Sequence, residues 1–529
     1  MRRRLYVDRD GDVTESEGSM ATEPAVRCAD VERNYAEFNA RAAAAAAGLA
    51  EFGVGAGDRV AIVLRNSVEF LELSVAAGLA GAGPVPINWH WSGDDLRYVL
   101  SDSGSRVVFA HSDFVPTVME LAPVGVEVIE VPMTDALRQA AGAPPTPTGT
   151  APRELESWLA EDRAPLQPGE GLPAGIIYTS GTTGYPKGIV REASDPEKTL
   201  SMVMKFVERF GLRPGGSTLV PAPMYHSAPN AVSALAVRLG MDVTVMPRFD
   251  PEEMLALIER YRIEQVQVVP TMMIRLLRLP EAVRNRYDLS SLKRLVHAAA
   301  PCPVDVKRQT IEWLGPIVHE YYGGTETGPV TWCDSEEWLA HPGTVGAAID
   351  GAILRIVGAD GEELPVGSDG TVYAKPPTYW PNFTYLGDDK KRQAMEREGY
   401  LTVGDVGHVD GDGYLYLSDR ANDMVISGGV NIYPAEIEAV LTSLPGVHDS
   451  AVFGIPDEEY GEALAAHIEL EPSAQLTEDD VRKHVRQHLA GYKVPKVVVF
   501  ADELPREDTG KLFKRRLREP YWAGTGRNI

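Results

Sequence analysis

The stretch Tyr178-Thr-Ser-Gly-Thr-Thr-Gly-Tyr-Pro-Lys-Gly188 directly follows a short apolar run at residues 174–177. A strand that empties into a loop rich in glycine, serine and threonine presents backbone N–H groups and hydroxyls to an anion, and Lys187 adds a positive charge. The stretch does not match the GxxxxGK[ST] pattern of Walker A loops. An ordinary turn is the alternative, but the four hydroxyl side chains, two glycines and a lysine of this loop favour an anion site.

A second glycine-rich stretch, Tyr321-Tyr-Gly-Gly-Thr-Glu-Thr-Gly328, follows the apolar run at residues 316–318. The glycine pair lets a ligand approach the backbone closely, and a tyrosine beside it offers a face for a flat base. Glu326 offers a hard oxygen ligand to Mg²⁺. Considered alone, a loop at a strand end without any ligand would explain this stretch equally well.

Two charged side chains flank a predicted hairpin further along the chain. Asp405 ends the run Tyr-Leu-Thr-Val-Gly-Asp of residues 400–405, and Arg420 lies in the run that starts at Leu417. An aspartate after glycine is ordinarily part of a turn. A carboxylate and a guanidinium on either side of a hairpin can instead bind the two hydroxyls of a ribose, because one accepts and the other donates hydrogen bonds.

Two further motifs lie near the end of the chain. In the run Ser427-Gly-Gly-Val-Asn-Ile-Tyr-Pro434 the glycine pair fits a narrow passage, and Pro434 is placed to start a helix. Lys511 follows an Asp-Thr-Gly turn, so its ammonium group is predicted at a loop tip that can reach another domain. Without the other motifs, a solvated lysine would be the better interpretation.

Together, the order and spacing of these motifs resemble the adenylate-forming superfamily of acyl-CoA synthetases, adenylation domains and luciferases over nearly the full length. Residues 427–434 are most similar to the acyl-CoA synthetases, and residues 297–322 somewhat resemble bile-acid and steroid-type CoA ligases. The resemblance implies an α/β fold. A large N-terminal domain of stacked α/β layers with a β-rich subdomain is expected over residues 1–420, and a small, mobile α+β C-terminal domain over residues 421–529.

The resemblance further implies an ATP-dependent acid–thiol ligase. Such an enzyme converts a carboxylic acid into an acyl-adenylate and then into its coenzyme A thioester, releasing AMP and pyrophosphate. ATP, Mg²⁺ and coenzyme A as co-substrate are therefore expected. Both reactants of the first step are anions, so the site must supply positive charge.

Individual roles follow from the matched motifs. The residues expected around ATP or AMP are Thr179, Ser180, Gly181, Thr182, Thr183, Gly184, Lys187, Ala299, Ala300, Pro301, Tyr321, Tyr322, Gly323, Asp405 and Arg420. Tyr322 is expected to stack on the adenine. The expected catalytic residues are Thr325 at the α-phosphate, Glu326 as the ligand of Mg²⁺, His226 beside the carboxylate, and Lys511 bridging the acid and the α-phosphate.

Three smaller sets complete the implied site. Coenzyme A is expected to pass Ser427, Gly428 and Gly429. The acyl pocket is expected to be lined by Tyr225, Asn230, Thr271, Ala298 and Gly324. Several of these are small or modest in size, which favours a bulky, apolar acid, either long-chain or polycyclic. Asn422 stands at the hinge about which the C-terminal domain would rotate between the two steps.

Two positions depart from the pattern of the family. The hinge residue is usually aspartate or lysine rather than Asn422, and Tyr185 is bulky for a mobile phosphate loop. An alternative therefore stays open, in which the same fold performs mainly one half-reaction, either adenylation or thioesterification of a supplied acyl-adenylate. A nucleotide-binding protein without turnover is disfavoured because Lys511, Glu326 and His226 are all present.

Length and composition bound these expectations. The 529 residues exceed what one hydrophobic core accommodates, so about two to four packed units are expected. The formal net charge of −25 argues against a general affinity for nucleic acid.

The three cysteines form no CxxC pair, which favours reduced thiols in the cytoplasm over disulfides or a zinc site. No apolar run is long enough for stable membrane insertion, and a homodimer is compatible with the sequence.

The alternation of apolar runs with helical patterns predicts stacked layers with mostly parallel strands. The expected elements are a hairpin around Asp10-Gly11, a helix over residues 31–52, a strand over 59–64, a helix over 67–80, a loop or subdomain boundary over 140–168, and a small β-rich unit over 371–417. After residue 421 the pattern predicts β-α-β-β-α-β, with apolar runs at residues 450–454, 464–470 and 496–500.

Overall fold

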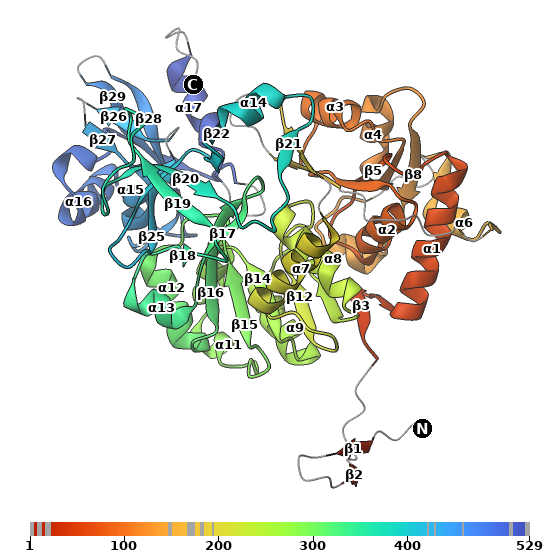
Figure 1. The fold of residues 1–529 in the computed structure, drawn as a ribbon. Helices are drawn as coiled ribbons and strands as arrows, with labels where there is room; N and C mark the ends of the chain where they lie inside the picture. Colours follow the sequence, from red (N-terminus) through yellow and green to blue (C-terminus); the bar gives the residue numbers. More distant parts are fainter. Residues whose placement is uncertain are drawn as a thin grey trace.

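The computed structural model describes residues 5–7, 13–15, 23–145, 151–164, 166, 175–179, 185–192, 195–420, 423–427, 430–457, 460–506 and 512–523 of the chain (Figure 1). They form an α/β fold in which a large N-terminal domain of several sheets carries a small C-terminal domain, as the motifs predict. No helix within these ranges is both long enough and apolar enough to cross a membrane.

The largest sheet has nine strands in the order β18-β17-β16-β15-β14-β12-β13-β3-β4. Its inner strands are parallel, and the pairs β3–β4, β16–β17 and β17–β18 are antiparallel. The strands are β3 (Ala25–Cys28), β4 (Val31–Asn34), β12 (Ser217–Val220), β13 (Asp242–Val245), β14 (Gln265–Val268), β15 (Arg294–His297), β16 (Val318–Gly324), β17 (Gly328–Cys333) and β18 (Ala347–Ala348). Parallel neighbours require crossover connections, and helices supply them here.

Helices cover both faces of this sheet. Apolar side chains of α7 and α8 share one core cluster with one face, and those of α9, α10 and α12 share a second cluster with the other face. The helices are α7 (Pro196–Phe210), α8 (Ser227–Arg238), α9 (Pro251–Tyr261), α10 (Pro270–Leu277), α11 (Glu281–Arg284), α12 (Val304–Leu314) and α13 (Ser335–Ala340). The strand order reverses at β12, which lies between β13 and β14, and ligands of such sheets bind where the order reverses.

A second sheet contains the five parallel strands β6-β5-β7-β8-β9. Its elements are β5 (Arg59–Val63), α2 (Val68–Leu79), β6 (Gly83–Pro86), α3 (Gly93–Asp102), β7 (Val107–His111), α4 (Val115–Leu121), β8 (Glu127–Val131), α5 (Asp135–Ala140), β9 (Arg153–Glu154) and α6 (Leu155–Leu159). The expectation of a loop over residues 140–168 is wrong for β9 and α6. Trp158 of α6 is buried against helix α1 (Tyr35–Glu51), where a Cβ on Gly48 would lie 2.2 Å from its ring.

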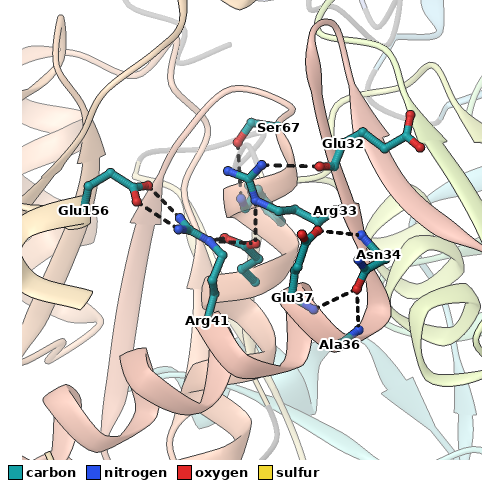
Figure 2. Close-up of polar contacts among 10 residues, drawn as sticks. Glu32, Arg33, Asn34, Ala36, Glu37, Arg41, Ser67 and Glu156 are labelled. Carbon is teal, nitrogen blue, oxygen red and sulfur yellow. Dashed lines mark hydrogen bonds and ion pairs between the residues drawn. The ribbon is translucent and has the colours of Figure 1, made fainter. Parts of the chain in front are cut away.

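The helix expected over residues 31–52 begins later than the pattern predicts. Residues 31–34 form β4, and α1 (Tyr35–Glu51) starts after Asn34. The Asn34 side chain accepts hydrogen bonds from the backbone N–H groups of Ala36 and Glu37, and the Asn34 N–H donates to the Glu37 carboxylate (Figure 2). Such a cap is worth about 1 kcal/mol, and it sets the start of the helix where periodicity alone does not.

Two smaller sheets complete the N-terminal domain. The β-rich unit expected over residues 371–417 is a six-stranded sheet in which β24 and β25 form a hairpin. Its elements are β19 (Ile353–Val357), β20 (Gly370–Lys375), β22 (Glu396–Arg397), β23 (Tyr400–Leu401), β24 (Asp405–Val409) and β25 (Leu415–Arg420), with α14 (Asp389–Ala394) nearby in the chain. The other sheet contains β10 (Ile176–Thr179), β11 (Lys187–Arg191) and β21 (Phe383–Tyr385). The expected N-terminal hairpin is also present as β1 (Leu5–Val7) and β2 (Val13–Glu15).

The C-terminal domain contains the hairpin β26–β27 and the sheet β28-β29-β30. Its elements are β26 (Val425–Ser427), β27 (Val430–Ile432), α15 (Pro434–Thr442), β28 (Val447–Asp457), β29 (Gly461–Leu470), α16 (Glu478–His488), the 3₁₀ turn Gly491–Lys493, β30 (Val497–Ala501) and α17 (Lys514–Trp522). Pro434 is the first residue of α15, as predicted. Arg278, just after α10, contacts His448 Nδ1 at 2.8 Å and donates to the Val447 carbonyl oxygen at 3.1 Å, which ties the two domains together.

Candidate active site

A cavity of about 820 Å³ lies at the carboxyl ends of β14, β15 and β16, beside the point where the strand order reverses. The turn after β15 and the final residues of β16 form part of its wall, and His226 reaches it from the segment between β12 and α8. The expected site residues on the wall are Thr179, Lys187, Tyr225, His226, Ala298, Ala299, Ala300, Pro301, Tyr321, Tyr322, Gly323, Gly324, Thr325, Glu326 and Asp405. The topology thus brings together motifs that are far apart in the sequence.

Other expected residues lie elsewhere. Among the described residues, Asn230, Thr271 and Ser427 are not part of the cavity wall. The Asn230 side-chain amide instead donates to the Met224 carbonyl oxygen at 3.0 Å. Outside the described residues lie Ser180, Gly181, Thr182, Thr183, Gly184, Asn422, Gly428, Gly429, Lys511 and the side chain of Arg420.

The end of the cavity at which the nucleotide is expected is built from two distant motifs. The Tyr322 hydroxyl donates to Asp405 Oδ2 at 2.6 Å, which joins β16 to the start of β24. Asp405 and Arg420 are register partners in the hairpin β24–β25, so the backbone places them side by side. Ala299 has a φ of 77°, a left-handed conformation that non-glycine residues rarely adopt. It turns the chain sharply after β15, where Ala299, Ala300 and Pro301 face the cavity.

Thr325 and Glu326 occupy the centre of the wall. The Thr325 and Ser227 hydroxyls lie 3.1 Å apart, which links the loop after β16 to the residue that follows His226. Glu326 Oε1 accepts a hydrogen bond from the Tyr385 hydroxyl at 2.9 Å, while its Oε2 accepts none from the described residues. Mg²⁺ needs only one or two protein carboxylates beside phosphate and water oxygens. The Glu326 carboxylate therefore fits a magnesium ligand.

Arg191, which also lines the cavity, holds this loop in place, and the sequence motifs did not include it. Its guanidinium donates to the carbonyl oxygens of Glu326 (2.7 Å), Pro381 (3.1 Å) and Thr325. Burial lowers the pKa of Arg191 to about 10, and the nearby Glu326 carboxylate opposes that shift. Arg191 lies on β11, three residues beyond the first motif, and only the pairing of β11 with β21 makes its position evident.

Lys391 of α14 is a second residue that sequence reasoning missed. It lines the cavity beside Lys187, so the two ammonium groups face the same space. Burial lowers the pKa of Lys187 to about 8, and the like charge of Lys391 adds to the shift, whereas Glu326 and Asp388 oppose it. Two cations held together in this way suit a polyanionic ligand.

We expect the specificity constant kcat/KM for ATP to fall about 3- to 10-fold between about pH 7 and about pH 9, because it reports the free enzyme, in which Lys187 loses its proton near pH 8. Lys391→Gln should move this fall to higher pH, because removing the like charge raises the pKa of Lys187. The neighbouring exposed Lys390 provides the control, since Lys390→Gln should keep the wild-type profile. Identical profiles for all three proteins would contradict this electrostatic account.

Tyr185, which seemed bulky for a phosphate loop, has a defined place. Its ring stacks on Tyr98 of α3, with centroids 4.6 Å apart and planes at 13°. The side chain remains 53% exposed. It therefore packs on the outer surface of α3, and Tyr185 is not part of the cavity wall within the described chain.

Two family models match the chain. The model of the AMP-binding enzymes matches residues 15–381, and that of the AMP-binding enzyme C-terminal domain matches residues 436–511. Similar proteins include the long-chain-fatty-acid–CoA ligase FadD13 of Mycobacterium tuberculosis, 33% identical over 93% of this chain and 94% of that protein. Feruloyl-CoA synthase of Amycolatopsis is 34% identical over 94% of this chain and 96% of that protein.

The solved structures of MatB from Rhodopseudomonas palustris are also similar. The ATP-bound form is 29% identical, covers 96% of this chain and 97% of that chain, and has a TM-score of 0.78. The apo form is 30% identical, covers 94% and 96%, and has a TM-score of 0.66. The two forms have nearly equal sequence identity to this chain and nearly equal coverage. The higher TM-score of the ATP-bound form therefore means that the backbone of this chain is arranged more like that form.

The matched models span most of the chain, and relatives that match over nearly their whole length are named as a CoA ligase and a CoA synthase. The chain therefore belongs to the AMP-binding, adenylate-forming enzymes, as an AMP-forming acid–CoA ligase that works through an acyl-adenylate.

Proposed function

We propose that this ligase performs both half-reactions on a bulky, apolar carboxylic acid, either long-chain or polycyclic, with Mg²⁺ bound at Glu326. The observation that carries the proposal is the extension of the cavity beyond Thr325, between α7, α8 and the large sheet. Its wall there is mostly apolar and includes Met202, Phe206, Ala228, Ala231 and Ala298. The long-chain and aromatic acids named for FadD13 and feruloyl-CoA synthase are compatible with such a space.

In the first step, the acid carboxylate attacks the α-phosphate of ATP and pyrophosphate leaves. His226 lies beside the carboxylate and Thr325 beside the α-phosphate, and the Ser227–Thr325 contact holds these two parts of the wall together. Lys187 and Lys391 face the leaving pyrophosphate. Mg²⁺, when bound by Glu326, would offset phosphate charge. Preorganised charges of this kind stabilise a phosphoryl-transfer transition state because they need no rearrangement during reaction.

In the second step, the thiol of coenzyme A attacks the carbonyl carbon of the acyl-adenylate and loses its proton, so that the thioester forms and AMP leaves. Residues 421–529 rotate about Asn422 between the steps, so that the Lys511 side of this domain is replaced by the passage at Ser427, Gly428 and Gly429. Two observations support a domain that works directly on the cavity. Ala435 in the first turn of α15 lines it, and the Arg278–His448 contact between the two domains is solvent-exposed, so a rotation can break it.

The test is a screen of carboxylic acids of graded size. Acid-dependent pyrophosphate release measures the first step, and thioester formation with coenzyme A measures the whole reaction. Large apolar acids should give the highest kcat/KM in both assays. Preference for acetate or propionate would overturn the proposed acid class. Activity in only one assay, with thioester formed from synthetic acyl-adenylate as the comparison, would establish the half-reaction alternative instead.

A further inference from the structure

Strand β14 carries two glutamines into the apolar interior. Gln265 and Gln267 alternate with Val266 and Val268, and all four residues are buried. The valines belong to the core beneath α9 and α10. The glutamines therefore lie on the opposite face, where Gln267 is the register partner of Val296 and faces the same side as α7 and α8.

The hydrogen bonds of these two amides are incomplete. Gln265 is 1% exposed and Gln267 is 3% exposed. Gln265 Oε1 accepts a hydrogen bond from the Thr218 hydroxyl at 2.5 Å, while its Nε2 has no partner in the described structure. Gln267 Oε1 also has none. If the oxygen and nitrogen of either amide are exchanged, one buried polar atom of that amide still lacks a hydrogen-bond partner. Buried polar groups are ordinarily satisfied, so a partner for Gln267 is missing.

Gln267 lies on the wall of the active-site cavity, whereas Gln265 does not. The wall of the same cavity includes the apolar side chains of Met202, Phe206, Ala231 and Val269. Glu320 also lines the cavity, but it is paired with the buried Lys307 at 2.6 Å and lies on the opposite face of the sheet from Gln267, because it is in register with His297 and not with Val296. A charged ligand group beside Gln267 would thus be buried without a counter-ion, which is costly. The amide suits a neutral hydrogen-bonding group.

We propose that Gln267 recognises a neutral oxygen substituent, a hydroxyl or a ketone, on the hydrocarbon part of the acid. The preferred substrates are then bulky acids that carry one such group, rather than plain fatty acids or diacids. This inference rests on the proposed function and narrows its acid class. A substrate without the oxygen leaves the amide buried and without a hydrogen-bond partner. The free-energy cost of that unpaired amide lowers kcat/KM for such a substrate relative to the oxygenated acid.

The experiment compares matched acids with the same carbon skeleton: 3-phenylpropanoate with its three ring-hydroxylated isomers, indane-propanoate with its ring ketones, and dodecanoate with its hydroxy and keto derivatives. For the wild type, the best oxygenated acid of at least one series should exceed its parent in kcat/KM by about 10-fold or more. Gln267→Met should bring this ratio to about 1 or below, mainly because the parent acid improves. Gln267→Leu provides a second variant of the same test.

The matched control is Gln265→Met, which changes the same side chain two residues away, off the cavity wall. It should keep the wild-type ratio. Equal kcat/KM for parent and oxygenated acids in the wild type would overturn the inference, and so would a ratio that survives Gln267→Met. In either case the amides are satisfied by trapped water. Failure of the proposed function looks different, because then no acid of the panel would support pyrophosphate release and thioester formation.

Discussion

Lys511→Ala is expected to lower acid-dependent pyrophosphate release by about 10²- to 10³-fold or more. In the proposed first step, the ammonium group of Lys511 lies between the acid carboxylate and the α-phosphate, where two anions approach each other. Loss of one preorganised charge at that point raises the barrier directly. Thioester formation from synthetic acyl-adenylate should remain largely intact, because the C-terminal domain has by then turned Lys511 away.

The assay therefore measures both half-reactions for the same variant. A suitable control is Lys514→Ala, three residues further on at the start of α17, where the ammonium pairs with Glu438 at 2.9 Å. That substitution removes a nearby charge within the C-terminal domain and should leave the ratio of the two half-reactions near the wild-type value. Equal loss of both half-reactions in Lys511→Ala would contradict the proposed rotation of the domain.

The fold class and the part of the site in the N-terminal domain follow from local patterns that the sequence displays. A motif at the end of a buried parallel strand needs no long-range information, because the carboxyl ends of such strands meet at one edge of the sheet. The loop that contains Thr325 was predictable for this reason, whereas the role of Ala299 was expected only from the resemblance to the family. The hairpin β24–β25 was likewise predictable, together with the register pair Asp405 and Arg420.

Other features depend on contacts between distant segments, which no local pattern displays. Arg191 reaches the Thr325 carbonyl across 134 positions of the chain, and Lys391 meets Lys187 only because α14 follows the edge strand β21. The loop expected over residues 140–168 proved to contain Trp158, whose burial depends on the missing side chain of Gly48 in α1. The position of Gln267 is indicated by a local pattern, because two glutamines alternate with valines in a fully buried strand and so lie together on one of its faces.

Arg191→Met is expected to reduce kcat by about 10²-fold, because a shift of about 1 Å in a catalytic group can cost that much. The arginine donates to three carbonyl oxygens and packs over Trp380 and Phe383, so it holds the Thr325–Glu326 loop against β21. Methionine fills similar space but leaves those carbonyls without donors. Arg191→Lys should recover little, because an ammonium group cannot reproduce the planar guanidinium fork.

The measurement that separates positioning from simple destabilisation is the dependence of pyrophosphate release on Mg²⁺ concentration, together with the thermal midpoint. If Arg191 positions Glu326, the Mg²⁺ requirement of Arg191→Met rises while the folded fraction stays near one at the assay temperature. Arg392→Met is the matched control. Arg392 also packs on Phe383 and donates to its carbonyl oxygen at 3.0 Å, but it does not contact the loop. It should lower the thermal midpoint without changing the Mg²⁺ requirement. Equal kinetic effects of the two substitutions would show that Arg191 merely stabilises the sheet.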